Sequence, residues 1–143
     1  MSNFTFNQHE KLKSKKLIEF LFKNGKSFNS FPYRVIYIPH TPSMNIPESV
    51  GFVANYPAKF GISVSTKKFK RAVDRNKVKR LSREIWRLHK HLLYPHLITQ
   101  QVNIAVFLIY TQSEILTYNE LEKGVIAAIH KLKNITETVN IIV

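Results

Sequence analysis

The sequence predicts one α+β domain in which helices pack against a mixed β-sheet, in the order αβββαβα. Apolar residues recur at helical spacing in three segments, near 15–24, 71–94 and 117–133. Apolar residues alternate with others, or run almost without interruption, in segments near 28–39, 59–66 and 101–110. The length of 143 residues, 44% of them hydrophobic, suits a single domain with one core.

The first helix is expected over residues 15–24. Ser14 supplies an N-cap, and Asn24-Gly25 supplies a left-handed stop. The apolar stripe of this helix consists of Leu17, Ile18, Leu21 and Phe22. The residues before the helix, 1–13, are expected to form a loose, mildly basic arm.

Alternation predicts one strand over residues 28–39, with an aromatic face and a mixed face. Residues 40–48 contain two prolines and are expected to form a loop, and residues 51–55 extend a strand at most as far as Pro57. A clearer strand covers residues 59–66. A third strand before the long helix, at residues 67–69, is expected to be very short.

The second half of the chain has clearer boundaries. Pro95 ends the long basic helix, and the apolar run at residues 101–110 predicts a strand buried on both faces. Thr117 and Glu120 have the spacing of a capping box, which predicts a last helix running to about Lys133. Its inward stripe is expected to contain Tyr118, Leu121, Val125, Ala128 or Ile129, and Leu132. We therefore divide the chain into an arm (1–13), a single domain (14–134) and a tail (135–143).

Positive charge is concentrated in residues 59–90. This stretch holds 12 of the 22 Lys and Arg residues against only Asp74 and Glu84, so it carries +10 of the formal net charge of +13. An apolar stripe at helical steps runs through Val78, Leu81, Ile85, Leu88 and Leu92. On the opposite side, Arg75, Lys79, Arg83 and Arg87 stack every four residues. Like charges at this spacing cost a helix about 0.2–0.5 kcal/mol per pair, so the row indicates an external polyanion.

Three interpretations of this basic face are possible: a solvated surface, a membrane-binding surface or a nucleic-acid-binding surface. A solvated face normally mixes acidic with basic residues, whereas here Glu84 alone lies within the row. The apolar stripe is narrow, which packing on a sheet explains better than burial in an anionic bilayer. Arg forks that fit phosphates favour nucleic acid. The aromatic candidates for stacking on bases are Trp86, which flanks the row, and Phe20, Phe22, Tyr33 and Tyr37.

Nothing in the sequence indicates catalysis by the chain itself, so no catalytic residue and no metal-binding residue is predicted. The chain has no cysteine, its four glycines form no phosphate-binding loop, and its six histidines have no carboxylate cluster beside them. The N-terminus lacks a secretory signal, and the longest apolar run, 104–110, is too short to span a bilayer. A cytoplasmic location is therefore expected.

Residues 72–84, AVDRNKVKRLSRE, closely resemble the RNR motif of the protein subunit of bacterial ribonuclease P, A-V-x-R-N-R-x-K-R-x-x-R-E. Flanking segments fit the same family, at residues 12–13, 22–25, 61–65 and 116–122. The resemblance extends over residues 11–133. It implies a two-layer α/β sandwich with a left-handed βαβ crossover, similar to a domain of a ribosomal small-subunit protein.

The resemblance also implies a function. In this family the RNA subunit is the catalyst and uses magnesium to remove the 5′ leader of precursor tRNA, while the protein binds both RNAs, with one protein expected per catalytic RNA. The alternative is a stand-alone RNA-binding or ribosome-associated protein of similar fold.

Carried over by position, the resemblance and the charge pattern assign RNA contacts to Lys68, Arg71, Arg75, Asn76, Lys77, Lys79, Arg80, Arg83 and Arg87. The leader is expected to contact Phe22, Lys68 and Arg75 in a cleft between the sheet and the basic helix. Several positions depart from the family pattern, among them Lys70-Arg71, where a Gly-Asn pair is common. Lys77 stands where the motif has Arg and offers a point charge instead of a fork, and Ile18 stands where many relatives have a second cleft Phe.

Overall fold

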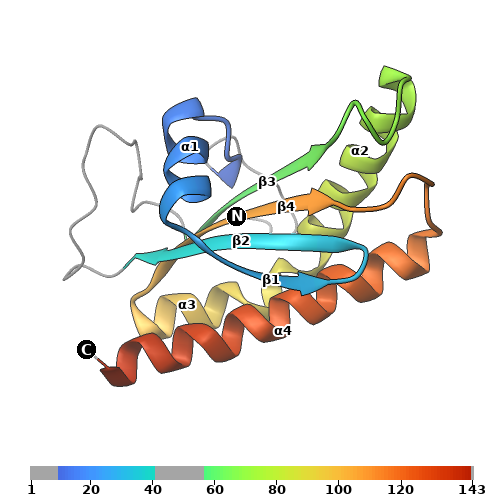
Figure 1. The fold of residues 1–143 in the computed structure, drawn as a ribbon. Coiled ribbons are helices and arrows are strands. Elements are labelled where there is room, and N and C mark those ends of the chain that lie inside the picture. The colour runs from blue at the N-terminus through green and yellow to red at the C-terminus, as the bar shows by residue number, and fades with distance from the viewer. Residues whose placement is uncertain (1–9, 41–56, 143) are drawn as a thin grey trace.

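The computed structural model describes residues 10–40 and 57–142, with side chains up to Glu137. The elements follow in the order α1 (Lys15–Asn24), β1 (Lys26–Ser30), β2 (Tyr33–His40), β3 (Ala58–Val64), α2 (Ala72–His89), the 3-10 helix η3 (Lys90–Leu92), α3 (Tyr94–Gln100), β4 (Asn103–Tyr110) and α4 (Tyr118–Ile142) (Figure 1). The predicted α+β class and the order αβββαβα are confirmed, with α3 as an additional helix. Pro95 lies in the first turn of α3, where its missing amide hydrogen costs nothing.

The four strands form one mixed sheet in the order β1-β2-β4-β3. The pairs β1–β2 and β2–β4 are antiparallel, whereas β3 and β4 are parallel. Parallel neighbours need a crossover, and here α2 and α3 supply it. In this strand order β3 lies at one edge of the sheet, and α2 is the next element along the chain.

Helices cover the two faces of the sheet unequally (Figure 1). The larger core lies between the sheet and α2, α3 and α4, and it contains Val35, Phe60 and Val106 from three strands. A smaller cluster on the other face joins α1 to the sheet through Leu17 and Phe107. The predicted sandwich thus consists of the sheet and three helices, and α1 adds a partial layer on the opposite face.

The strand predicted at residues 28–39 is a hairpin of β1 and β2 that turns at Phe31 and Pro32, joined by a cis peptide bond. Proline lacks an amide hydrogen and is tolerated at such a turn, but the alternation of side chains continues across it and hides the break. The short strand predicted at residues 67–69 is a turn as well. There the amides of Lys68 and Phe69 donate to the carbonyl of Ser65.

Ser14 caps α1 as predicted, because its Oγ accepts a hydrogen bond from the amide of Leu17 at 3.3 Å. The left-handed stop at Gly25 is wrong, since this residue has φ −75° and ψ 158°. Space explains the glycine instead. A Cβ at this position would lie 2.5 Å from the carbonyl oxygen of Leu21 and 2.9 Å from Cγ2 of Ile36.

The capping box at the start of α4 is confirmed: the amide of Glu120 donates to Oγ1 of Thr117, and the amide of Thr117 donates to Oε1 of Glu120. Two other expectations for α4 are wrong. The helix continues to Ile142 instead of ending near Lys133, and Tyr118 is exposed rather than inward. Thr136, placed in the tail by the sequence, is buried.

The N-terminal segment also differs from expectation. Glu10 and Leu12 are buried, and the amide of Leu12 donates to the carbonyl of Phe60 at 2.9 Å. Residues 10–12 are therefore fixed at the edge of β3 and do not belong to a loose arm. Residues 1–9 and the candidate strand at 51–55 lie outside the described residues, and the division into arm, domain and tail stays a prediction. Within the described residues, every helix is too short or too polar to cross a membrane.

Candidate RNA-binding surface

α2 rests on the sheet through one buried face. Val78, Ser82, Ile85 and Trp86 form this face. The indole of Trp86 stacks on the ring of Phe60, with centroids 4.4 Å apart and an interplanar angle of 16°. The apolar stripe predicted for this helix is thus rotated slightly, since Leu81 and Leu88 are only half-buried. The rotation carries Trp86 into the core and leaves the opposite side of the helix to solvent.

The proposed base-stacking role of Trp86 is wrong. Its side chain is 1% exposed, and its Nε1 donates a hydrogen bond to the hydroxyl of Tyr94 at 3.4 Å. Tyr33 and Tyr37 are buried too, on the face of the sheet that α4 covers. Of the aromatic candidates, Phe22 is the most exposed, at 52%.

The predicted RNA contacts lie along the solvent side of α2 and on the turn before it. The exposed members are Lys68, Arg71, Asn76, Lys77, Arg80 and Arg83. The half-buried members are Arg75, Lys79 and Arg87. Within the described residues, Arg87 is the one member of this set with a carboxylate partner. The structure therefore brings the basic residues together on one helix face whose charge is largely uncompensated. We call this set the α2 basic face.

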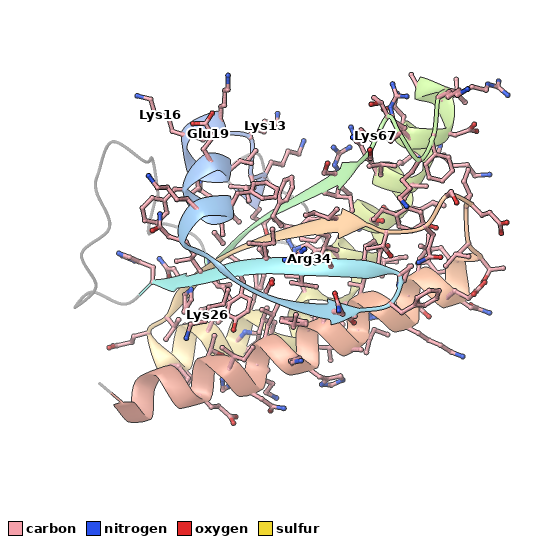
Figure 2. All side chains as sticks on the ribbon, in the orientation of Figure 1. Lys13, Lys16, Glu19, Lys26, Arg34 and Lys67 are labelled. Atoms are coloured by element: carbon pink, nitrogen blue, oxygen red, sulfur yellow. The ribbon has the colours of Figure 1, made fainter. Side chains whose placement is uncertain are left out.

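Arg75 organises the turn that carries Lys68. Its Nη1 donates to the carbonyl oxygens of Phe69 at 2.8 Å and Lys70 at 3.1 Å. Phe69 is buried and its ring stacks on that of Tyr110, with centroids 6.1 Å apart. The bonds from Arg75 and the packing of Phe69 therefore hold this turn beside the first turn of α2. Figure 2 shows Lys67, which lies on the same turn, close to that end of the helix.

Arg87 is the exception on the α2 basic face. Its Nε and Nη2 both donate to the carboxylate of Glu84, one turn earlier on the helix. This hydrogen bond holds the pKa of Glu84 below its ordinary value. The pair neutralises Arg87 at neutral pH, so this residue contributes less attraction for an anion than its neighbours do.

A shallow cavity of about 140 Å³ lies on the other face of the sheet, beside α1. Its lining consists of Phe22, Gly25, Ser27, Arg34, Ile36 and Ile109. The ring of Phe22 meets that of Phe107 edge-on at 5.6 Å, which leaves much of Phe22 open to solvent. The Nη2 of Arg34 donates to Oγ of Ser27 at 3.4 Å. Lys68 and Arg75 do not line this cavity.

Sequence reasoning did not single out Arg34. It is the one charged residue in the run of residues 31–39, and this isolated cation was the available signal. The structure therefore separates the three residues predicted for the leader. Phe22, on α1, lines one cavity with Arg34 of β2, whereas Lys68 and Arg75 lie on the turn before α2 and in its first turn.

The histidines contact α4 at two places. Nε2 of His89 lies 3.0 Å from a carboxylate oxygen of Glu122, and Nδ1 of His96 lies 3.9 Å from one of Glu137. These contacts join α2 and α3 to α4 across the helical layer. Among residues 10–40 and 57–137, no group of three or more His, Asp or Glu side chains is arranged to hold a metal ion.

Comparisons with known proteins show which family this chain belongs to. The family model for ribonuclease P matches residues 6–133. The ribonuclease P protein component of Porphyromonas gingivalis is 31% identical over 121 residues, which cover 85% of this chain and 81% of that protein. The ribonuclease P protein structure from Thermotoga maritima aligns with a TM-score of 0.62 at 21% identity, over 85% of this chain and 96% of that one. The Staphylococcus aureus structure aligns with a TM-score of 0.61 at 20% identity, over 86% and 94%.

The two solved structures show that the fold is shared. The family match and the Porphyromonas relative show that the chain is a member of the family. This chain belongs to the ribonuclease P protein family, whose members are the protein component of the endoribonuclease that matures the 5′ end of tRNA.

Proposed function

We propose that the α2 basic face binds the catalytic RNA subunit of ribonuclease P. The observation that carries this proposal is the placement of the predicted cations on one side of a helix whose other side is locked to the sheet by Phe60 and Trp86. A rigid row of cations displaces counterions from folded RNA without reorganising first. Contacts of this kind give affinity and register rather than sequence selection.

We further propose that the cavity beside α1 receives the single-stranded 5′ leader of precursor tRNA. Phe22 offers an exposed ring on which an unpaired base can stack, and Arg34 offers a cation for the adjacent phosphate. Lys68 and Arg75 would contact the leader further along its path, at the start of α2. This division of the leader residues into two groups follows from their separation on the surface.

The chemistry of cleavage is assigned to the RNA subunit and to magnesium bound there. The protein contributes electrostatics, because two polyanions, the catalytic RNA and the precursor, must approach each other. Fixed cations between them lower the repulsion and so reduce the magnesium concentration that cleavage requires. One protein per RNA subunit, in the cytoplasm, is sufficient for this role.

Reconstitution tests the proposal. Precursor tRNA is incubated with the catalytic RNA at limiting magnesium, with and without the protein. The protein is expected to raise the cleavage rate and to cut nothing alone. Arg80→Gln should reduce the stimulation, whereas Lys123→Gln, on an exposed part of α4, should retain it. Equal rates with and without the wild-type protein would contradict the proposal, and co-purification with ribosomal RNA instead would favour a ribosome-associated protein.

A further inference from the structure

A groove of about 330 Å³ lies at the edge of β3 that faces away from β4. Its lining consists of Lys11, Leu12, Lys13, Phe60, Gly61, Ile62 and Arg83. The lining thus contains three cationic side chains, of Lys11, Lys13 and Arg83, and no carboxylate. Two of the cations come from the N-terminal segment, and the third, Arg83, comes from α2 and follows Lys13 by 70 residues. We call this feature the β3-edge groove.

One wall of the groove is the N-terminal segment, which is held at both the main chain and a side chain. Lys11 forms a parallel bridge with Phe60, and the amide of Leu12 donates to the carbonyl of Phe60. Just before it, the carboxylate of Glu10 lies 2.8 Å from Nζ of Lys90, and both side chains are more than nine-tenths buried. A charged pair buried to this extent strongly resists separation, because breaking it leaves an unpaired buried charge. The segment is therefore positioned before any ligand binds.

Lys13 follows this fixed segment immediately and is exposed. Figure 2 shows Lys13 on the side of α1 that faces β3 and α2. A cation on a fixed main chain loses less conformational freedom on binding than one on a loose arm. The arrangement therefore favours binding of an anion at Lys13.

Arg83 forms the opposite wall. It lies on α2 one turn before Trp86, whose stacking on Phe60 ties this part of the helix to the same strand that the N-terminal segment pairs with. Both walls of the groove are thus attached to Phe60, one by hydrogen bonding and one by ring stacking. The spacing between their cations is set by the core and not by surface contacts.

The floor of the groove contributes one main-chain donor. In the parallel ladder with β4, the main-chain amide and carbonyl groups of every second residue of β3 point away from β4. Phe60 is one of these residues, and its carbonyl accepts the hydrogen bond from the amide of Leu12. The same alternation turns the amide of Ile62 toward the groove. Close packing explains the glycine at position 61, because a Cβ there would lie 2.8 Å from the ring of Phe107 and 3.2 Å from Cβ of Leu12.

We propose that the β3-edge groove binds a run of phosphates of the catalytic RNA subunit and extends the α2 basic face to the N-terminal segment. The ligand class follows from cations on both walls, an amide donor on the floor and the absence of a lining carboxylate. The catalytic RNA is chosen over the leader because Arg83 belongs to both the groove and the α2 basic face, whereas Phe22 lies outside the groove. This inference rests on the proposed function of α2.

Site-directed RNA cleavage tests the placement directly, since the chain has no native cysteine. An iron chelate that generates hydroxyl radicals is attached to single cysteines in Lys13→Cys, Val73→Cys and Lys123→Cys. Val73 is 66% exposed on α2, which makes it the positive probe, and Lys123 on α4 is the negative control. The probes at positions 13 and 73 are expected to cut neighbouring sites of the catalytic RNA, and the probe at position 123 is not.

The outcomes separate the two proposals. Cleavage from position 73 without cleavage from position 13 would overturn the groove and leave the proposed function standing. No cleavage from either position, in a complex otherwise able to form, would contradict the proposed function itself. Cleavage from position 13 confined to the leader of precursor tRNA would reassign the groove to the substrate and overturn our choice of the catalytic RNA.

A charge series gives a second, independent readout. Lys13→Gln and Arg83→Gln should each lower the magnitude of the salt slope of catalytic-RNA binding by about 0.9. Lys13→Arg should retain the slope, and Lys123→Gln should leave it unchanged. An unchanged slope in Lys13→Gln, with the unfolding midpoint also unchanged, would show that Lys13 contacts no phosphate and would overturn the proposal.

Discussion

The rings of Trp86 on α2 and Phe60 on β3 stack face to face, with centroids 4.4 Å apart. This contact joins the long basic helix to the edge strand of the sheet and fixes how far the helix is rotated about its axis. The rotation decides which residues of α2 reach solvent. The core and the α2 basic face are therefore coupled through one pair of aromatic residues.

Replacing Trp86 should destabilise the fold severely. Trp86→Ala removes a fully buried ring and leaves a cavity against Phe60, so we expect a loss of about 3–5 kcal/mol in the free energy of unfolding. Urea denaturation at neutral pH, followed by circular dichroism, measures this loss. Val73→Ala on the exposed side of the same helix is the control and should change stability by no more than about 0.5 kcal/mol. A similar midpoint in both variants would contradict the packing described here.

A buried hydroxyl pair gives a second stability test. The hydroxyl of Tyr33 on β2 lies 2.7 Å from Oγ of Ser82 on α2, and burial raises the pKa of Tyr33 above its ordinary range. Tyr33→Phe or Ser82→Ala alone leaves one buried hydroxyl without its partner and should cost about 1–3 kcal/mol. The double variant should cost clearly less than the sum of the two single losses. Strict additivity in this double-mutant cycle would show that the hydroxyls do not interact.

The ion pair on α2 predicts unequal roles for two arginines. Arg87 is engaged by Glu84, whereas Arg80 is exposed without a carboxylate partner in the described residues. Arg87→Gln should therefore weaken catalytic-RNA binding less than Arg80→Gln does. Glu84→Gln should strengthen binding, because it removes a negative charge and the ion pair that engages Arg87. Filter binding at a fixed salt concentration measures all three, and equal losses in the two arginine variants would refute the distinction.

The same pair predicts a pH dependence with a defined sign. Its hydrogen bond to Arg87 lowers the pKa of Glu84 from the ordinary 4.5. A depressed carboxyl pKa means that the pair is intact above that ordinary value and is lost as the pH falls through the lowered one. Carbon-detected NMR titration of Glu84 should give a midpoint below 4.5 in the wild type and a higher midpoint in Arg87→Gln. Identical midpoints would mean that the pair does not form in solution.

Much of the fold was predictable because its signals are local. The helical period and dense charge of residues 71–90 identified α2, and Ser14, Thr117 and Glu120 identified two helix starts through their own side chains. The hairpin of β1 and β2 was not predictable from alternation. The side-chain pattern runs on through Phe31 and Pro32, so only the pairing of the two strands reveals the turn.

The site was predicted less completely, because its decisive contacts join distant residues. Nothing near Glu10 in the sequence signals its contact with Lys90, 80 residues away, yet this pair helps fix one wall of the β3-edge groove. Trp86 lies at the border between the two sides of a helical wheel, and its contact with Phe60 places it in the core. Arg34 gained its significance only when β2 was placed beside α1.

The salt dependence of catalytic-RNA binding tests the central claim most directly. Wild-type protein, Arg80→Gln and the control Lys123→Gln are titrated against the catalytic RNA over a range of monovalent salt at constant magnesium. We predict that Arg80→Gln weakens binding by about 1 kcal/mol and lowers the magnitude of the salt slope by about one, while the control matches the wild type. An Arg80→Gln curve that coincides with the wild type would contradict the claim that α2 presents its cations to RNA.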